Sequence, residues 1–216
     1  MKKTILFDLD GTLIDSTPAI LDGFGAAFLA HGELAPKSEA VKALVGHPLD
    51  FMFAGLGAPT HLVPDYIAAY KARYEQIFLE QTSLLDGAAG ALALASEVAD
   101  VGVVTTKTSK FSVILLEHLG VMKFIKTVIG RDDVINPKPD PEPINRALER
   151  LGNTSAQDKA NAFMVGDTTM DLEAAKHAGI AGVGLVCGYG NEADLRGHSN
   201  LIFKNAFEAV KFIAGR

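Results

Sequence analysis

The sequence predicts an α/β protein built on a mainly parallel sheet, and two observations support that prediction. From about residue 100 onward, short apolar runs alternate with helical patterns. Strands that are apolar on both faces and alternate with helices are typical of a parallel sheet covered on both sides. Residues 16–82 interrupt this alternation with helical patterns alone. We therefore expect a doubly wound core domain, residues 1–15 plus 83–216, with a small helical-bundle cap at 16–82 inserted after the first strand.

The core elements follow from apolar spacing and from the residues at element ends. The first strand is the apolar run before Asp8, and helix 109–119 places Phe111, Ile114, Leu115 and His118 on one face. Helix 141–152 begins with prolines and ends on glycine, and helix 171–179 is acidic at its start and basic near its end. The other expected elements are strand 101–105, an apolar run at 124–129, strands 162–165, 182–186 and 201–203, and helix 206–213.

The expected cap consists of four helical patterns, at residues 16–31, 38–45, 49–56 and 62–81. In the last pattern Ile67, Tyr70, Tyr74 and Phe78 recur at spacings of three and four, which predicts an amphipathic helix. Glycine and proline separate the four segments, as expected for short connections between helices.

Composition excludes several classes of function. The chain has 216 residues, 48% of them hydrophobic, and a net charge of −6. It has no lysine- or arginine-rich run, which argues against a nucleic-acid groove or a membrane-surface patch. No apolar stretch approaches the roughly 18 residues of a membrane span. Cys187 is the only cysteine, so an intrachain disulfide and a zinc–thiolate cluster are excluded. We expect a cytoplasmic protein, either a monomer or a homodimer.

Two aspartates directly follow the first strand. Asp8 and Asp10 are two residues apart, so on an extended chain they face the same side, roughly 6.5–7 Å apart. Gly11 allows a tight turn there and leaves backbone amides available to an anion. Carboxylate oxygens at such a point suit Mg²⁺, which prefers one or two carboxylates, water and a phosphate oxygen.

More polar residues follow other predicted strands. The segment GDTTMD, residues 166–171, follows strand 162–165 and supplies Asp167 and Asp171. Thr105 ends strand 101–105, and Lys138 lies in the loop before helix 141–152. Because the carboxyl ends of parallel strands form one edge of the sheet, these residues are expected to gather there. Four carboxylates, one lysine and one hydroxyl predict a metal-plus-phosphate site.

In these motifs the chain resembles the haloacid-dehalogenase-like phosphohydrolase superfamily. Asp-x-Asp-Gly-Thr at 8–12 is similar to its first signature and Thr105 to its second. Lys138-Pro139 is similar to the third signature and Gly-Asp-x-x-x-Asp at 166–171 to the fourth. The resemblance covers essentially the whole chain and implies a Rossmann-like core with a helical cap between the first and second signatures.

The resemblance also implies a role for each residue. Asp8 would attack phosphorus and form an aspartyl phosphate, and Asp10 would act as general acid and then as general base. Thr105 and Lys138 would hold the phosphoryl group, with Gly11 and Thr106 beside it. Mg²⁺ would be bound by Asp8, the backbone carbonyl of Asp10 and Asp167, while Asp171 would support the metal's water shell or orient Lys138. His47, in a turn of the cap, would be a candidate substrate contact.

The wording of the motifs is most similar to the phosphoglycolate-phosphatase-like group. The implied function is Mg²⁺-dependent hydrolysis of a small phosphorylated metabolite, with 2-phosphoglycolate the first substrate to test. Alternatives that stay open are an inorganic pyrophosphatase, a 5′-nucleotidase and a β-phosphoglucomutase-like isomerase. Asp10 argues against the dehalogenating branch, which lacks an acid at that position. A non-catalytic phosphate-binding module is the remaining rival, although the complete set of catalytic residue types argues against it.

Overall fold

The computed structural model describes residues 3–216 and divides the chain into two compact units. One unit comprises the chain up to Ile14 together with Leu84–Arg216, and the other comprises Asp15–Ser83. The chain passes between the units through two short strands that pair with each other, β2 (Ile14–Asp15) and β3 (Ser83–Leu84).

The first unit contains a six-stranded sheet in the order β5-β4-β1-β6-β7-β8. Every pair of neighbouring strands in it is parallel. From the inner strand β1 the chain winds first to one side of the sheet and then to the other, which confirms the predicted doubly wound α/β class. The strands are β1 (Lys3–Phe7), β4 (Ala99–Val104), β5 (Thr127–Ile129), β6 (Ala162–Gly166), β7 (Ala181–Leu185) and β8 (Ile202–Phe203).

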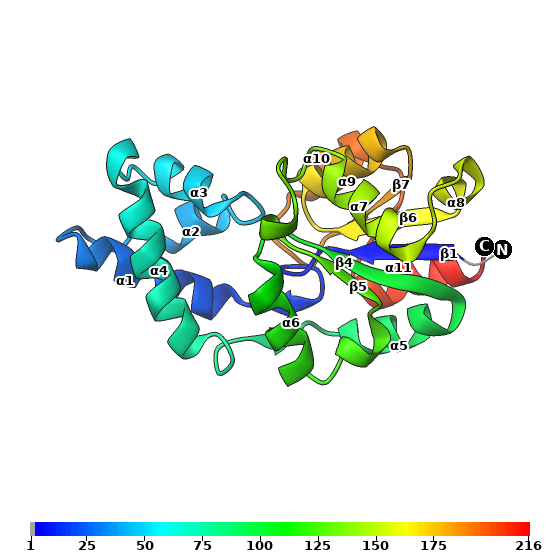
Figure 1. Ribbon diagram of the computed structural model, residues 1–216, viewed down its shortest axis with the longest axis horizontal. Helices are drawn as coiled ribbons and strands as arrows, with labels where there is room; N and C mark the ends of the chain where they lie inside the picture. The colour runs from blue at the N-terminus through cyan, green and yellow to red at the C-terminus, as the bar shows by residue number, and fades with distance from the viewer. Residues whose placement is uncertain (1–2) are drawn as a thin grey trace. The chain divides into compact units, whose positions relative to one another are not determined.

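Helices cover both faces of this sheet. Helices α7 and α9 contact each other and lie on one side, while α5 and α11 contact each other and lie on the opposite side (Figure 1). On the α7–α9 side, the fully buried Leu6 and Met164 of the sheet pack with Ile144 and Leu148 of α7. The helices of the unit are α5 (Ala88–Val98), α6 (Ser109–His118), α7 (Glu142–Leu151), α8 (Ala156–Ala160), α9 (Thr169–Ala178), α10 (Glu192–His198) and α11 (Ala206–Ala214).

The sequence prediction missed three helices of this unit and the buried face of a fourth. Helices α5, α8 and α10 fall where no element was expected. In α6 the buried residues are Ser112, Leu115 and Leu116, whereas His118 is exposed. The expected face was only partly right, because Leu115 is buried and Phe111 and Ile114 are half-buried, while the polar Ser112 is buried as well. Its hydroxyl donates a hydrogen bond to the carbonyl oxygen of Thr108 at 2.9 Å, so it can be buried at little cost.

The second unit is helical. It contains α1 (Thr17–Ala30), α2 (Ser38–Lys42), α3 (Leu49–Gly55), the 3₁₀ helix η1 (Thr60–Leu62) and α4 (Val63–Ile77). Helices α1 and α4 pack closely, because a Cβ atom on Gly23 would lie 2.7 Å from the ring of Tyr70. The core of the unit is aromatic, with Phe24, Phe53 and Tyr70 in mutual ring contact.

The apolar face of α4 differs by one residue from the expected face. Tyr66 is fully buried, whereas Ile67 is only half-buried. Tyr66 can occupy the buried position because its hydroxyl donates a hydrogen bond to a carboxylate oxygen of Glu33 at 2.7 Å. Among residues 3–216, no helix has the length and apolar character needed to cross a membrane.

Candidate active site

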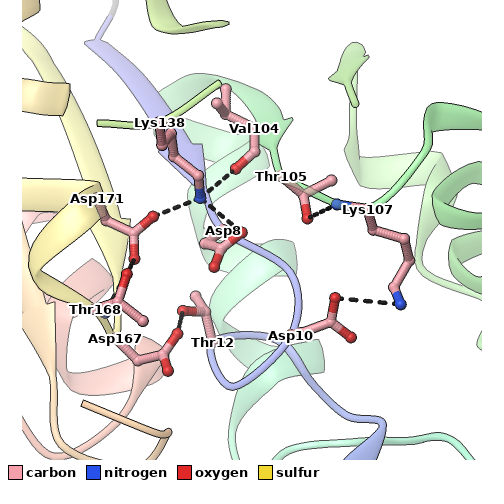
Figure 2. Close-up of polar contacts among 10 residues, drawn as sticks. All are labelled: Asp8, Asp10, Thr12, Val104, Thr105, Lys107, Lys138, Asp167, Thr168 and Asp171. Carbon is pink, nitrogen blue, oxygen red and sulfur yellow. Dashed lines mark hydrogen bonds and ion pairs between the residues drawn. The ribbon is translucent and has the colours of Figure 1, made fainter. Parts of the chain in front are cut away.

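The polar residues after β1, β4 and β6 lie at one edge of the sheet because these strands are adjacent and parallel. Phe7 of β1 is in register with Val103 of β4 and Val165 of β6. Asp8 follows directly, and its backbone N–H donates to the carbonyl oxygen of Val165 at 2.9 Å. Thr105 and Asp167 follow the neighbouring strands, and the side chains meet beyond the strand ends (Figure 2).

Lys138 is the cation at the centre of this group. Its ammonium lies 2.9 Å from Oδ1 of Asp8, 2.5 Å from Oδ1 of Asp171 and 3.1 Å from the carbonyl oxygen of Val104. An ammonium has three N–H donors, so these acceptors use all of them and fix its position. Burial opposes the charge, but Asp171 and Asp8 outweigh it and hold the pKa of Lys138 well above its ordinary value.

Asp171 is held from two sides. Its Oδ1 faces Lys138, and its Oδ2 accepts hydrogen bonds from the backbone N–H of Thr168 at 3.0 Å and from the Thr168 hydroxyl at 2.7 Å. This is a capping box at the start of α9. Gly166 lies directly against it, because a Cβ atom there would lie 2.3 Å from Cγ of Asp171. Asp171 therefore joins the start of α9 to Lys138.

Asp167 is fully buried, and each of its two oxygens accepts a hydrogen bond. Oδ1 accepts from the Thr12 hydroxyl at 2.7 Å, and Oδ2 accepts from the backbone N–H of Tyr189 at 2.8 Å. Glycines allow this close packing, because a Cβ atom on Gly11 or Gly188 would lie 2.4 or 2.1 Å from Oδ2. Gly11 also has φ +84°, a conformation that favours glycine.

Negative charge exceeds positive charge in this cluster. Asp8, Asp167 and Asp171 are buried and offer carboxylate oxygens that all lie within 4.8 Å of one another. Burial raises the pKa of Asp8 to about 7, against the opposing effect of Lys138. Burial and the charges of Asp8 and Asp171 raise the pKa of Asp167 well above its ordinary value. Buried carboxylates that repel one another and provide hard oxygen ligands fit a divalent cation.

Asp10 lies outside this cluster of carboxylates. Its Oδ2 is 3.3 Å from the ammonium of Lys107, and both side chains are largely buried (Figure 2). The turn that follows Asp10 is closed by the N–H of Gly11, which donates to the carbonyl oxygen of Ile14 at 2.9 Å. The two aspartates of the first motif thus face two different lysines, Lys138 and Lys107.

Comparison with known proteins identifies the family. The family model described as haloacid dehalogenase-like hydrolase matches residues 5–185. The chain belongs to the haloacid dehalogenase-like hydrolase family. Its sheet order and its strand-end aspartates agree with that membership, and the predicted family is confirmed.

Named relatives and solved structures that are similar to this haloacid dehalogenase-like hydrolase agree with the family assignment. A phosphoglycolate phosphatase of Rhodospirillum rubrum is 37% identical over 204 residues, which cover 89% of this chain and 83% of that protein. Pyrophosphatase PpaX of Bacillus velezensis is 34% identical, with 84% and 82% covered. A solved haloacid dehalogenase-like family hydrolase from Streptococcus pneumoniae has a TM-score of 0.87 at 24% identity, with 98% of each chain covered, and supports the fold. The prediction of an enzyme, a phosphatase of this family, is confirmed.

The predicted site residues fall into three groups in this hydrolase. Asp8, Lys138, Asp167 and Asp171 gather in one buried cluster. Beside the cluster lie Asp10 and Thr105 (Figure 2), the latter followed by the half-buried Thr106, and Gly11 packs against Asp167. His47 belongs to the other unit, where it stacks on Phe51 with ring centroids 4.3 Å apart.

Three further features of the site were not predicted as functional. Thr12, the last residue of the first motif, holds Asp167, and Lys107 contacts Asp10. The loop after β7 reaches Asp167 through Tyr189 and the flanking Gly188. The sequence carries a signal for each, namely the Thr of Asp-Gly-Thr, the Lys two residues after Thr105, and the Gly-Tyr-Gly after strand 182–186.

Proposed function

We propose that this hydrolase is a Mg²⁺-dependent phosphatase that cleaves a small phosphate monoester through an aspartyl phosphate, with 2-phosphoglycolate as the first candidate substrate. The observation that supports this most is the environment of Asp8. Its carboxylate lies 2.9 Å from the buried ammonium of Lys138, in a cluster of three carboxylates. The 37% identical phosphoglycolate phosphatase supports the choice of substrate.

A carboxylate can attack a phosphate dianion only if charge repulsion between the two is reduced. Lys138 supplies one positive charge beside Asp8. Asp8, the backbone carbonyl of Asp10 and Asp167 would hold Mg²⁺, with Asp171 adding its charge or fixing Lys138. When bound, the cation would offset the charge of the carboxylates and of the phosphoryl oxygens.

The reaction would proceed in two displacements. An Oδ atom of Asp8 forms a bond to phosphorus while the bond between phosphorus and the leaving oxygen breaks. Protonated Asp10 gives its proton to that oxygen, and the alcohol departs. Asp10, now ionised, takes a proton from water, whose oxygen attacks phosphorus. The Asp8–phosphorus bond then breaks, and inorganic phosphate and the Asp8 carboxylate are released.

The remaining predicted residues would bind the phosphoryl group. Thr105 is buried, and its Oγ1 accepts a hydrogen bond from the backbone N–H of Lys107 at 3.2 Å. Its own O–H remains a donor that can be directed at a phosphoryl oxygen. The backbone around Gly11 and Thr106 would add N–H donors, and Lys138 would contact the same group. Asp171 would act as a positioning residue through its contact with Lys138.

We propose that the helical unit acts as a cap that selects the substrate. The domains would then be a core, residues 1–15 plus 83–216, and a cap, residues 16–82, with hinges near 15–18 and 82–87. His47 is the candidate substrate contact on the cap. A cytoplasmic location and a monomeric or homodimeric state remain predictions.

A second candidate is an inorganic pyrophosphatase, which the 34% identical PpaX favours. The same two displacements would cleave pyrophosphate, with phosphate as the leaving group. A 5′-nucleotidase and a phosphomutase of the β-phosphoglucomutase type use the same chemistry on other substrates and remain predictions. A mutase would convert a sugar phosphate in the presence of a bisphosphate primer and release little phosphate.

The test is phosphate release from 2-phosphoglycolate, pyrophosphate, nucleoside monophosphates and hexose phosphates, each with Mg²⁺ and with a chelator. We expect Mg²⁺-dependent release that is fastest with 2-phosphoglycolate. Asp8→Asn should abolish release, and Asp194→Asn, which alters an exposed residue of α10, should not. Absence of Mg²⁺-dependent release from every substrate would contradict the proposal.

A further inference from the structure

Lys107 lies beside the proposed general acid. Its ammonium is 3.3 Å from Oδ2 of Asp10, and the exposed fractions of the two side chains are 10% and 14%. Asp8 has a different partner, Lys138. The two lysines therefore contact two different carboxylates. Lys107 contacts Asp10, the residue that would protonate the leaving group.

The backbone around Lys107 is fixed by the loop after β5. The carbonyl oxygen of Lys107 accepts a hydrogen bond from the N–H of Arg131 at 2.9 Å, and its N–H donates to Oγ1 of Thr105. Gly130 packs so tightly here that a Cβ atom on it would lie 2.2 Å from the backbone nitrogen of Ser109. A lysine on a backbone held in this way has a defined position, which a selective contact requires.

We propose that Lys107 selects substrates whose leaving group carries a negative charge, and this inference rests on the proposed phosphatase function. A general acid must lie within about 3 Å of the oxygen that it protonates. The ammonium is one contact further, so it lies within roughly 6 Å of the leaving oxygen. In 2-phosphoglycolate the leaving group is glycolate, whose carboxylate is two bonds from that oxygen. The carboxylate can therefore reach the ammonium.

The leaving groups that Lys107 would favour share a negative charge. Small hydroxy acids and inorganic phosphate carry the charge that Lys107 would bind, whereas neutral alcohols do not. In a partly buried setting, an ion pair with hydrogen-bonding geometry discriminates by about 10- to 100-fold. Lys138 is not placed to supply this preference, because it contacts Asp8 and Asp171 rather than Asp10.

The experiment compares two substrates that differ in leaving-group charge, 2-phosphoglycolate and 2-hydroxyethyl phosphate. Both would be assayed with the full-length wild type, Lys107→Met and Lys107→Arg in Mg²⁺. We expect Lys107→Met to lower kcat/KM for 2-phosphoglycolate about 10- to 100-fold more than for 2-hydroxyethyl phosphate. Lys107→Arg should restore part of the preference. The control Lys123→Met removes an exposed lysine elsewhere on the core and should change neither value.

The outcomes separate this inference from the proposed function. If Lys107→Met lowers kcat/KM equally for both substrates, the lysine only positions Asp10 and the inference is overturned. A wild type that hydrolyses the neutral ester as well as the acid also overturns it, while the phosphatase proposal stands. A wild type that releases no phosphate from either ester, nor from any other substrate in the panel, overturns both. Unfolding curves show whether each variant is folded before rates are compared.

Discussion

Replacing Asp167 with asparagine should stabilise the metal-free protein and remove its response to Mg²⁺. Asp167 is fully buried, and its carboxylate is close to those of Asp8 and Asp171. Asparagine has the same shape and can keep both hydrogen bonds, accepting from the N–H of Tyr189 and donating to the Thr12 hydroxyl. The change therefore removes one negative charge while leaving the packing in place.

The size of the effect follows from the geometry. Two like charges 4.8 Å apart repel by about 3 kcal/mol at an effective dielectric constant of ~20, and Asp167 has two such neighbours. The positive charge of Lys138, which contacts both of these neighbours, offsets part of this repulsion, and exchanging charged for neutral hydrogen bonds costs about 1–2 kcal/mol. A net gain of roughly 1–3 kcal/mol remains, which corresponds to about 2–12 °C in Tm for a chain of this length.

The stability gained by Asp167→Asn should be larger at high pH than at low pH. Asp167 and Asp8 have pKa values raised above 3.8 in the folded protein, and that of Asp8 is raised to about 7. The folded state therefore binds these protons more tightly than the unfolded state does. The destabilisation is absent below about pH 3.8 and grows as the pH rises through the raised pKa values of the two carboxyl groups, that of Asp8 being about 7. The difference in Tm between the variant and the wild type should accordingly be larger at pH 8 than at pH 5.

The assay is thermal unfolding in chelator and in millimolar Mg²⁺, at both pH values. Mg²⁺ should raise the Tm of the wild type and leave that of Asp167→Asn unchanged, because the variant has lost a predicted ligand. Asp194→Asn removes an exposed carboxylate and should behave as the wild type does. A lower Tm for metal-free Asp167→Asn at pH 8, or an undiminished response to Mg²⁺, would refute the reasoning.

Three further predictions follow from the same contacts. Asp8→Asn should abolish turnover, because a carboxamide cannot replace the attacking carboxylate, and residual turnover would indicate another nucleophile. Lys138→Met leaves two buried carboxylates without their ammonium, so it should lower the free energy of unfolding at pH 7 by about 3–5 kcal/mol, measured in urea. Gly188→Ala places a Cβ atom 2.1 Å from Oδ2 of Asp167 and should cost about 1–3 kcal/mol and weaken Mg²⁺ binding in calorimetry. Its control, Gly197→Ala in helix α10, meets nothing within 4 Å and should stabilise by about 0.5–1 kcal/mol; equal effects of the two glycine changes would contradict the argument.

The sheet was predictable because strands buried on both faces read as continuous apolar runs, as in Phe163–Val165. Helix α5 was not, because its sequence is rich in alanine and leucine and shows little contrast between its two faces. The faces of α4 and α6 were shifted because Tyr66 and Ser112 are buried, with their hydroxyl groups donating to Glu33 and to the carbonyl oxygen of Thr108. Such compensation depends on neighbours that the sequence does not reveal.

The candidate site also has a part that could be predicted from the sequence and a part that could not. Residues directly after strands were predictable, because parallel strand ends share one edge of the sheet whatever the loops do. The contact of Lys107 with Asp10 depends on how the loop after β5 holds the loop after β4. The hydrogen bond from Tyr189 to Asp167 depends on the path of the loop after β7. Both contacts are set by loop packing, which leaves no periodic pattern in the sequence.

The hydrogen bonds of the carboxylates bear on which cation the site would prefer. Oδ2 of Asp171 accepts two hydrogen bonds from Thr168 and its Oδ1 faces Lys138, so this residue has little left to offer a metal. Each oxygen of Asp167 accepts one hydrogen bond and keeps a second lone pair. Asp8 and Asp167 are then the carboxylates able to act as ligands, and water, a backbone carbonyl and phosphate would complete the shell. Such a shell is typical of Mg²⁺, whereas Ca²⁺ takes six to eight oxygen ligands, often from several carboxylates. We therefore expect Ca²⁺ to raise Tm less than Mg²⁺ at equal concentration, and a larger effect of Ca²⁺ would assign Asp171 to the metal rather than to Lys138.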